Sequence, residues 1–133
     1  MRKKDKEILL RDLSTRLSYG VVCKGVKVDI DVFKDEYVNR EVGGLLTNIG
    51  YNCCTLGIMT ECELSTIKPY LRPLSSMTEE ERKEYKHLVA FSGSSNGAAN
   101  FVDWLNARYF DYRGLIPMGL AIEVTEENNP YKE

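Results

Sequence analysis

The sequence predicts an α+β domain. We expect an N-terminal helix, a small antiparallel β-barrel or curled sheet over residues 19–67 (SH3-like in one form), and two C-terminal helices packed on it. Three observations predict this class: apolar residues at helical spacing near the N-terminus, a strict two-residue alternation around residue 29, and a helix-capping pattern at residue 78. A chain of 133 residues fits a single domain, with its helical part over 78–123.

The first expected element is an amphipathic helix over residues 3–17. Its leucines recur at spacings of three and four, with charged residues between them: Leu9 or Leu10, Leu13 and Leu17. This spacing gives a helix one apolar face. The dipeptide Tyr-Gly at 19–20 ends the pattern.

The clearest pattern in the chain is an alternation over residues 26–32. Apolar and charged side chains take turns there: Val26, Lys27, Val28, Asp29, Ile30, Asp31 and Val32. A period of two with one apolar face predicts a half-buried strand of an antiparallel sheet.

Glycines are concentrated in the same region. Six of the ten fall between residues 20 and 57, which is typical of short, bent strands joined by tight turns. We expect further strands around 41–49, 53–60 and 62–64, before two prolines at 69 and 73 exclude a regular helix. A closed barrel and an open sheet covered by helices both fit this pattern.

The pattern becomes helical after residue 77. Thr78 with Glu81 three positions later is a capping box, which predicts a helix starting there. The run SGSSNG at 92–97 predicts a flexible loop, and a last helix is expected over 98–110. The polar tail from residue 125 is expected to fray.

Charge and hydropathy exclude several classes of protein. The net charge of −2 argues against a dedicated nucleic-acid binder, because phosphate neutralisation needs a clustered basic surface. The basic start RKKDKE is typical of the solvated face of a first helix. No apolar run reaches the length of a signal-peptide core or a membrane span, so the sequence predicts a cytoplasmic protein without a membrane partner.

Residues with catalytic or metal-binding chemistry are sparse. The cysteines lack the paired C-x-x-C spacing of structural zinc and are expected to be thiols packed as small hydrophobes: Cys23, Cys53, Cys54 and Cys62. The run STIK at 65–68 matches the Ser-x-x-Lys pattern of serine acylases, but Pro69 disfavours the helix that this chemistry needs. The sole histidine, His87, lies on a highly charged helix. We therefore expect no catalytic residue, no metal and no cofactor.

The segment 101–124 combines the only Trp with two Phe and two Tyr. Such side chains bury large areas, so this segment is expected first of all to complete the core. The functional alternative is an exposed Tyr/Arg surface for a protein partner, since these residue types are enriched at binding hot spots: Tyr70, Arg72, Tyr112 and Arg113.

Three stretches, LLRDLSTRLSYGV, IKPYLRPLSSMTEEER and DWLNARYFDYRGLIPMGLAIE, carry a resemblance. They resemble a recurrent group of small proteins of unknown activity from gut Bacteroides-type bacteria and their phages or mobile elements. The resemblance covers residues 8–22, 67–82 and 103–123. It implies a bacterial cytosolic or prophage accessory protein, and it brings no catalytic residue with it.

Together these features predict a non-enzymatic accessory module that binds another protein. The alternative from a different class is nucleic-acid binding by the small β-barrel with help from the basic N-terminus. Residues 19–75 hold six basic and seven acidic side chains, so that region has no cationic excess to favour it. An enzyme of unrecognised class is the third hypothesis. The identity of the partner and the oligomeric state are left open.

Overall fold

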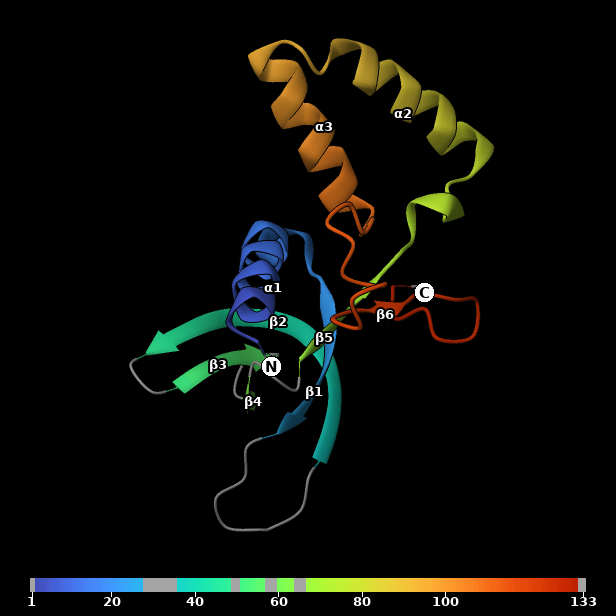
Figure 1. The fold of residues 1–133 in the computed structure, drawn as a ribbon. Helices are drawn as coiled ribbons and strands as arrows, with labels where there is room; N and C mark the ends of the chain where they lie inside the picture. Colours follow the sequence, from blue (N-terminus) through green and yellow to red (C-terminus); the bar gives the residue numbers. More distant parts are fainter. Residues whose placement is uncertain (1, 28–35, 49–50, 57–59, 64–66, 132–133) are drawn as a thin grey trace.

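The computed structural model describes residues 2–27, 36–48, 51–56, 60–63 and 67–131. Over these residues the fold is α+β, as the sequence predicts (Figure 1). The helices are α1 (Lys3–Arg16), α2 (Glu79–Phe91) and α3 (Ser95–Ala107), with the 3-10 turns η1 (Leu17–Tyr19) and η3 (Leu74–Ser76). The strands are β1 (Val22–Lys27), β2 (Glu36–Asn48), β3 (Tyr51–Leu56), β4 (Thr60–Glu63), β5 (Lys68–Leu71) and β6 (Ile122–Glu123). Each described helix is too short or too polar to cross a bilayer.

Helix α1 forms where the leucine spacing predicts it. Leu9 and Leu13 are fully buried on the face that meets the main core. The chain tightens into η1 after α1 and ends its helical path at Gly20, whose φ of 69° lies in the left-handed region that glycine adopts without strain. The amphipathic pattern therefore determines both the length of α1 and the face that it buries.

The strands pair in the order β2-β3-β4-β1-β5-β6, and β1 also pairs with β2. β1 runs antiparallel to β2 along its whole length and, among the described residues, meets β4 at one pair, Lys27 with Cys62. A register shift between Val42 and Gly44 marks a bulge in β2, the longest of these strands. Such a bulge bends a strand and increases its twist.

The expected strands are found with shifted ends. Those predicted at 41–49, 53–60 and 62–64 correspond to β2, β3 and β4. β1 begins before the alternation predicted at 26–32, and most of that alternation lies outside the described residues.

Helices α2 and α3 form an antiparallel hairpin, whereas the sequence predicted two helices packed on the sheet. Figure 1 shows this hairpin standing away from β2, β3 and β4. The facing sides of the two helices carry aromatic rings: Tyr85 lies 5.5 Å from Phe101 and 6.3 Å from Trp104 between ring centroids. Because each helix covers the apolar stripe of the other, neither needs the sheet for that purpose.

The turn of the hairpin is shorter than the loop expected at 92–97. The Oγ of Ser94 accepts a hydrogen bond from Gly97 N at 2.9 Å and caps α3, which begins at the next residue. A Cβ on Gly97 would lie 1.8 Å from the carbonyl oxygen of Phe91. The close approach of the two helices at their turn therefore requires glycine at this position.

Two apolar clusters form among the residues whose side chains the structure describes. The main cluster contains Leu9, Leu13, Val21, Cys23, Ile67, Leu71, Leu115, Leu120 and Ala121. The second cluster, at the base of the hairpin, contains Trp104, Leu105 and Phe110. The aromatic segment 101–124 thus contributes buried residues to both clusters, which supports the first of its two interpretations.

The polar tail is held by hydrogen bonds up to Tyr131, whereas fraying was expected from residue 125. Asn128 Oδ1 accepts from the backbone and hydroxyl of Thr125 at 2.6 and 3.0 Å. The ring of Tyr131 stacks on that of Tyr109, with centroids 3.7 Å apart and an interplanar angle of 7°. A single aromatic side chain thus anchors a segment whose composition predicts mobility.

Candidate functional site

The four Tyr and Arg residues expected at a binding surface occupy different environments. Tyr70 is only 7% exposed, and its carbonyl oxygen accepts from the Tyr131 hydroxyl at 2.7 Å. Arg72, Tyr112 and Arg113 are half-buried. Arg72 points to the start of α2, whereas Tyr112 and Arg113 contact α1. The structure therefore brings together Tyr112 with Arg113 but not the set of four.

Arg72 joins β5 to the hairpin. Its guanidinium donates to both carboxylate oxygens of Glu81, at 2.9 and 2.7 Å, and lies 4.3 Å from the ring centroid of Phe110. Glu81 also accepts from Thr78 N at 3.0 Å, which completes the predicted capping box. The hydrogen bond from Arg72 lowers the pKa of the Glu81 carboxyl below its ordinary value. Arg72 is thus occupied in holding the base of the hairpin.

Tyr112 and Arg113 belong to an ionic cluster on α1. The carboxylate of Asp12 is fully buried and accepts from Arg16 Nε and from Arg113 Nη1, each at 2.9 Å. Both guanidiniums lie over the ring of Tyr112, at 5.0 and 4.7 Å from its centroid. Two cations share one carboxylate, and the 21% exposure of the Arg113 side chain gives the extra charge access to water.

Arg16 is the innermost member of this cluster. Its side chain is fully buried, and Nη2 donates to the carbonyl oxygen of Phe110 at 2.6 Å. Among the described atoms its Nη1 has no hydrogen-bond partner. Sequence reasoning missed Asp12 and Arg16, because an Asp and an Arg four residues apart on a helix are equally typical of an exposed pair.

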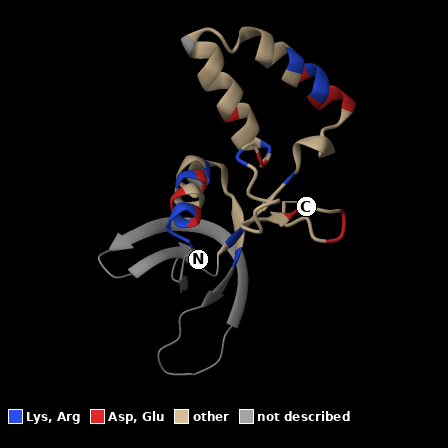
Figure 2. Cartoon of the chain, viewed as in Figure 1, with Lys and Arg blue, Asp and Glu red and all other residues tan. Residues whose placement is uncertain are grey.

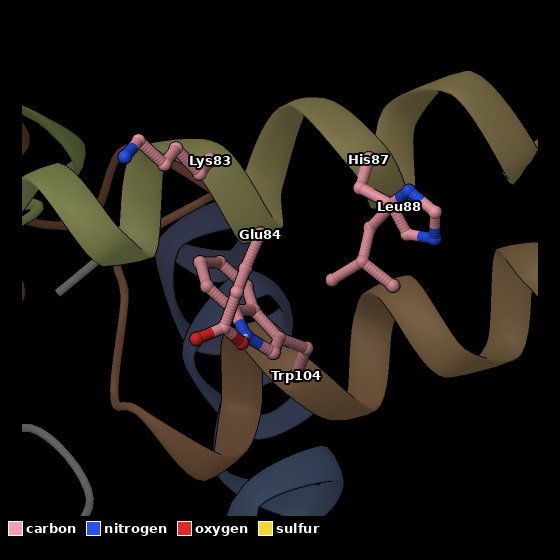
Figure 3. A pocket seen from close by; sticks show the side chains of 5 residues that line it. All are labelled: Lys83, Glu84, His87, Leu88 and Trp104. Atoms are coloured by element: carbon pink, nitrogen blue, oxygen red, sulfur yellow. Dashed lines mark hydrogen bonds between the residues drawn. The ribbon is translucent and has the colours of Figure 1, made fainter.

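A shallow pocket opens on one side of the hairpin (Figure 3). The residues that line it, here called the hairpin pocket, are Lys83, Glu84, His87, Leu88 and Trp104, and its volume is about 420 Å³. Figure 3 shows Glu84 and Leu88 extending from α2 toward Trp104 on α3, with Lys83 and His87 to either side. The lining is mainly apolar, as in ligand and peptide sites of this size.

Polar contacts hold the floor of the hairpin pocket in place. Trp104 Nε1 donates to Glu84 Oε2 at 2.9 Å, so the buried indole N–H is satisfied. Arg108 donates to the same carboxylate oxygen at 3.3 Å and lies 4.7 Å from the centroid of the Trp104 ring. The carboxylate of Glu84 is thereby paired with Arg108 and Trp104 within the hairpin.

Phe91 lies beside His87, one of the residues that line the hairpin pocket. It is 59% exposed, and its ring lies 4.8 Å from that of His87. α2, which carries both residues, has no buried residue among those described. The sequence indicated that the segment with Trp104 completes the core and that His87 lies on a highly charged helix, and it gave no signal that the two meet at a recess.

The described part of the chain offers few groups for a metal site, a reactive thiol or a basic surface. It contains no group of three His, Cys, Asp or Glu side chains placed to hold a metal ion. Cys23 is buried, while the other cysteine side chains and Ser65 lie outside what the structure describes. Figure 2 shows Lys and Arg interspersed with Asp and Glu on α1 and α2, so neither helix presents a uniformly basic surface in this view.

Comparison with protein-family models, curated proteins and solved structures finds no match for the chain. Its function must therefore be inferred from its own residues.

Proposed function

We propose that the chain is a cytoplasmic, non-enzymatic protein-interaction module whose partner docks on the hairpin pocket. The observation that carries this proposal is Phe91, 59% exposed beside a recess whose apolar residues are Leu88 and Trp104. An exposed aromatic side chain next to an apolar recess with polar edges is typical of protein-docking surfaces. The resemblance to small proteins of Bacteroides-type bacteria and their mobile elements supports a partner from a bacterial host or a prophage.

The construction of the hairpin supports the same function. It stands away from β2, β3 and β4 (Figure 1), and the Arg72–Glu81 pair holds its base. A partner would thus meet two helices that are already ordered, and binding to a preorganised surface costs less conformational entropy. Lys83 lines the recess, while the charge of Glu84 is already paired with Arg108. This balance favours a partner segment with an apolar anchor beside an acidic side chain.

For the strands we propose a small barrel of the SH3-like kind. β1 pairs with β2, β2 with β3, β3 with β4 and β4 with β1, so the pairings run in a circuit. The β4–β1 pair that the structure describes, Lys27 with Cys62, supports closure. Cross-strand nuclear Overhauser effects between these two residues in solution test the proposal, and their absence would favour the open sheet.

The docking proposal is tested by site-specific photo-cross-linking in cells of the organism whose genome encodes the protein. A benzophenone amino acid replaces Phe91 in one variant and Val102 in the other. Val102 is an apolar residue of comparable exposure, 39%, two positions before Trp104 and thus on nearly the opposite side of α3. We expect one protein to be captured from position 91, to resist nuclease, and to be lost on Lys83→Glu. Equal capture from both positions, or none from position 91, refutes the proposal.

The alternative functions give different results in the same experiment. Cross-links to nucleic acid, weakened by added salt, would favour binding of nucleic acid by the proposed barrel. The mixed charges of α1 and α2 give that alternative less support (Figure 2).

A further inference from the structure

Two tyrosines that lie twenty-two positions apart in the chain stack face to face. The ring of Tyr131, in the polar tail, lies on that of Tyr109 at the end of α3, with centroids 3.7 Å apart and an interplanar angle of 7°. Aromatic pairs prefer offset or edge-to-face arrangements with centroids about 4.5–7 Å apart. Other interactions of the two residues must therefore hold this contact in place.

The backbone of Tyr109 adopts a conformation that disfavours a bulky side chain. Its φ of 61° lies in the left-handed region, and the residue follows α3 where glycine often ends a helix. Phe110 N donates to Leu105 O at 3.0 Å and closes this turn. Strained residues are concentrated at functional sites, so the ring that Tyr109 presents to the tail is a candidate for such a site.

Hydrogen bonds place the two hydroxyls at the same end of the stack. The Tyr109 hydroxyl donates to Tyr19 O. The Tyr131 hydroxyl accepts at 3.0 Å from Val22 N, which lies three residues further along the chain, beyond the turn at Gly20. The carbon atoms ortho to the two hydroxyls therefore also lie at that end, and in nearly parallel rings the centroid distance of 3.7 Å brings them into van der Waals contact.

We propose that Tyr109 and Tyr131 form an oxidative cross-linking site, at which two equivalents of a one-electron oxidant, such as the oxidised haem of a peroxidase, join the rings as dityrosine. Each phenol gives one electron to the oxidant and its hydroxyl proton to water. The two phenoxyl radicals form a carbon–carbon bond between their ortho carbons. Each of these carbons then loses its hydrogen as a proton while the oxygen of the same ring gains one, which restores two phenols. The product has two hydrogen atoms fewer than the parent protein.

The stack favours coupling within one molecule. Ortho carbons in contact have to approach by only about 2 Å to reach the length of a carbon–carbon single bond, and reactants held in contact need no bimolecular encounter. Both residues are half-buried and so keep some access to solvent. The bond would tie the polar tail covalently to the end of α3. Neither tyrosine lines the hairpin pocket, so the site is independent of what docks there.

The test is oxidation of the folded protein by a photo-oxidised ruthenium tris-bipyridine complex with persulfate, a small diffusible one-electron oxidant. Cleavage after Lys and Arg and before Asp then leaves Tyr109, Tyr112 and Tyr131 in three separate peptides for mass spectrometry. We expect the main cross-linked pair to contain Tyr109 and Tyr131 and to lack two hydrogen atoms. A mixture of ordinary and isotope-labelled protein should yield this pair without mixed labels, because both rings belong to one molecule.

Two variants and one condition control the assignment. Tyr131→Phe keeps the ring but removes the phenol, so the cross-linked pair should disappear. Tyr85→Phe should leave its yield unchanged, because Tyr85 packs on Phe101 and Trp104, which cannot form dityrosine. Urea, which separates the stacked rings, should abolish the preference for this pair.

The oxidised parent protein decides the outcome, whatever the stability of the variants. Absence of the Tyr109–Tyr131 pair overturns the proposal, whether or not other tyrosines couple, provided that a tyrosine peptide oxidised in the same solution has formed dityrosine. An equal yield of the pair in the folded and the urea-unfolded protein also overturns it.

Discussion

The ionic cluster on α1 makes the strongest prediction about stability, through Asp12→Asn. The substitution keeps the shape of the side chain but removes the charge that two guanidiniums share at 2.9 Å each. Arg16 is fully buried, so its charge would lose its counterion in a place that water does not reach. Removing one partner of a buried pair costs about 3–5 kcal/mol. A domain of this size has a total unfolding free energy of about 5–15 kcal/mol, so we expect a large loss.

The assay is urea unfolding followed by the fluorescence of Trp104, the only tryptophan, which is 8% exposed and stacked 5.5 Å from Phe110. Far-ultraviolet circular dichroism recorded in parallel checks that the transition is two-state. The matched control is Asp5→Asn, in the first turn of the same helix, where loss of a favourable dipole interaction costs under about 1 kcal/mol.

A double variant separates lost charge from lost packing. Asp12→Leu with Arg16→Met removes the carboxylate and the innermost cation together, and apolar replacements of buried ion pairs are often neutral. Arg113, 21% exposed, can then turn to water. We expect the double variant to be more stable than Asp12→Asn. An Asp12→Asn loss below about 1 kcal/mol, or a double variant less stable than the single one, would refute the account of this cluster.

Two further predictions concern the hairpin. Glu81→Gln is expected to cost about 1 kcal/mol at pH 7. Because Arg72 lowers the pKa of Glu81 in the folded state, the stabilisation is fully present above the ordinary value of 4.5 and is lost as the pH falls through the folded value. The difference between parent and variant should therefore shrink on acidification, and a constant difference contradicts the assignment. Gly97→Ala should cost about 1–3 kcal/mol because its Cβ meets Phe91. Gly93→Ala, with open space around it, is its control in the same urea assay, and equal effects contradict the packing argument.

Local patterns in the sequence predicted local structure well. The leucine spacing of α1 and the capping box at Thr78 depend on residues three or four apart, whose geometry a helix fixes without reference to the rest of the chain. The α+β class follows from the same kind of evidence. Strand ends shifted because hydrogen-bonded partners, which sequence does not identify, decide where a strand stops.

Such local patterns could not predict how the helices pack in the tertiary structure. An apolar stripe such as Tyr85 with Leu88 packs equally well on a sheet or on another helix, and only the facing stripe of Phe101 and Trp104 decides between them. The sequence could not separate the two interpretations of the aromatic and Tyr/Arg residues, as core or as binding surface, for a related reason. Residue type identifies Arg72 and Arg113 as potential hot spots, but their partners Glu81 and Asp12 lie 9 and 101 residues away in the chain.

The hydrogen bonds and exposure of the candidate residues support the proposed hairpin pocket over the predicted Tyr/Arg surface as a docking site. Arg72 is bonded to Glu81 and stacked on Phe110, and a partner that recruited it would have to break these contacts. Phe91 exposes 59% of its surface to water and loses little by being covered. Burial of apolar surface is favourable, whereas exchange of one ion pair for another gains little. The Arg72–Glu81 pair that holds the base of the hairpin and the exposed Phe91 that a partner can cover are thus different residues, so Phe91→Ala should abolish binding without unfolding the protein.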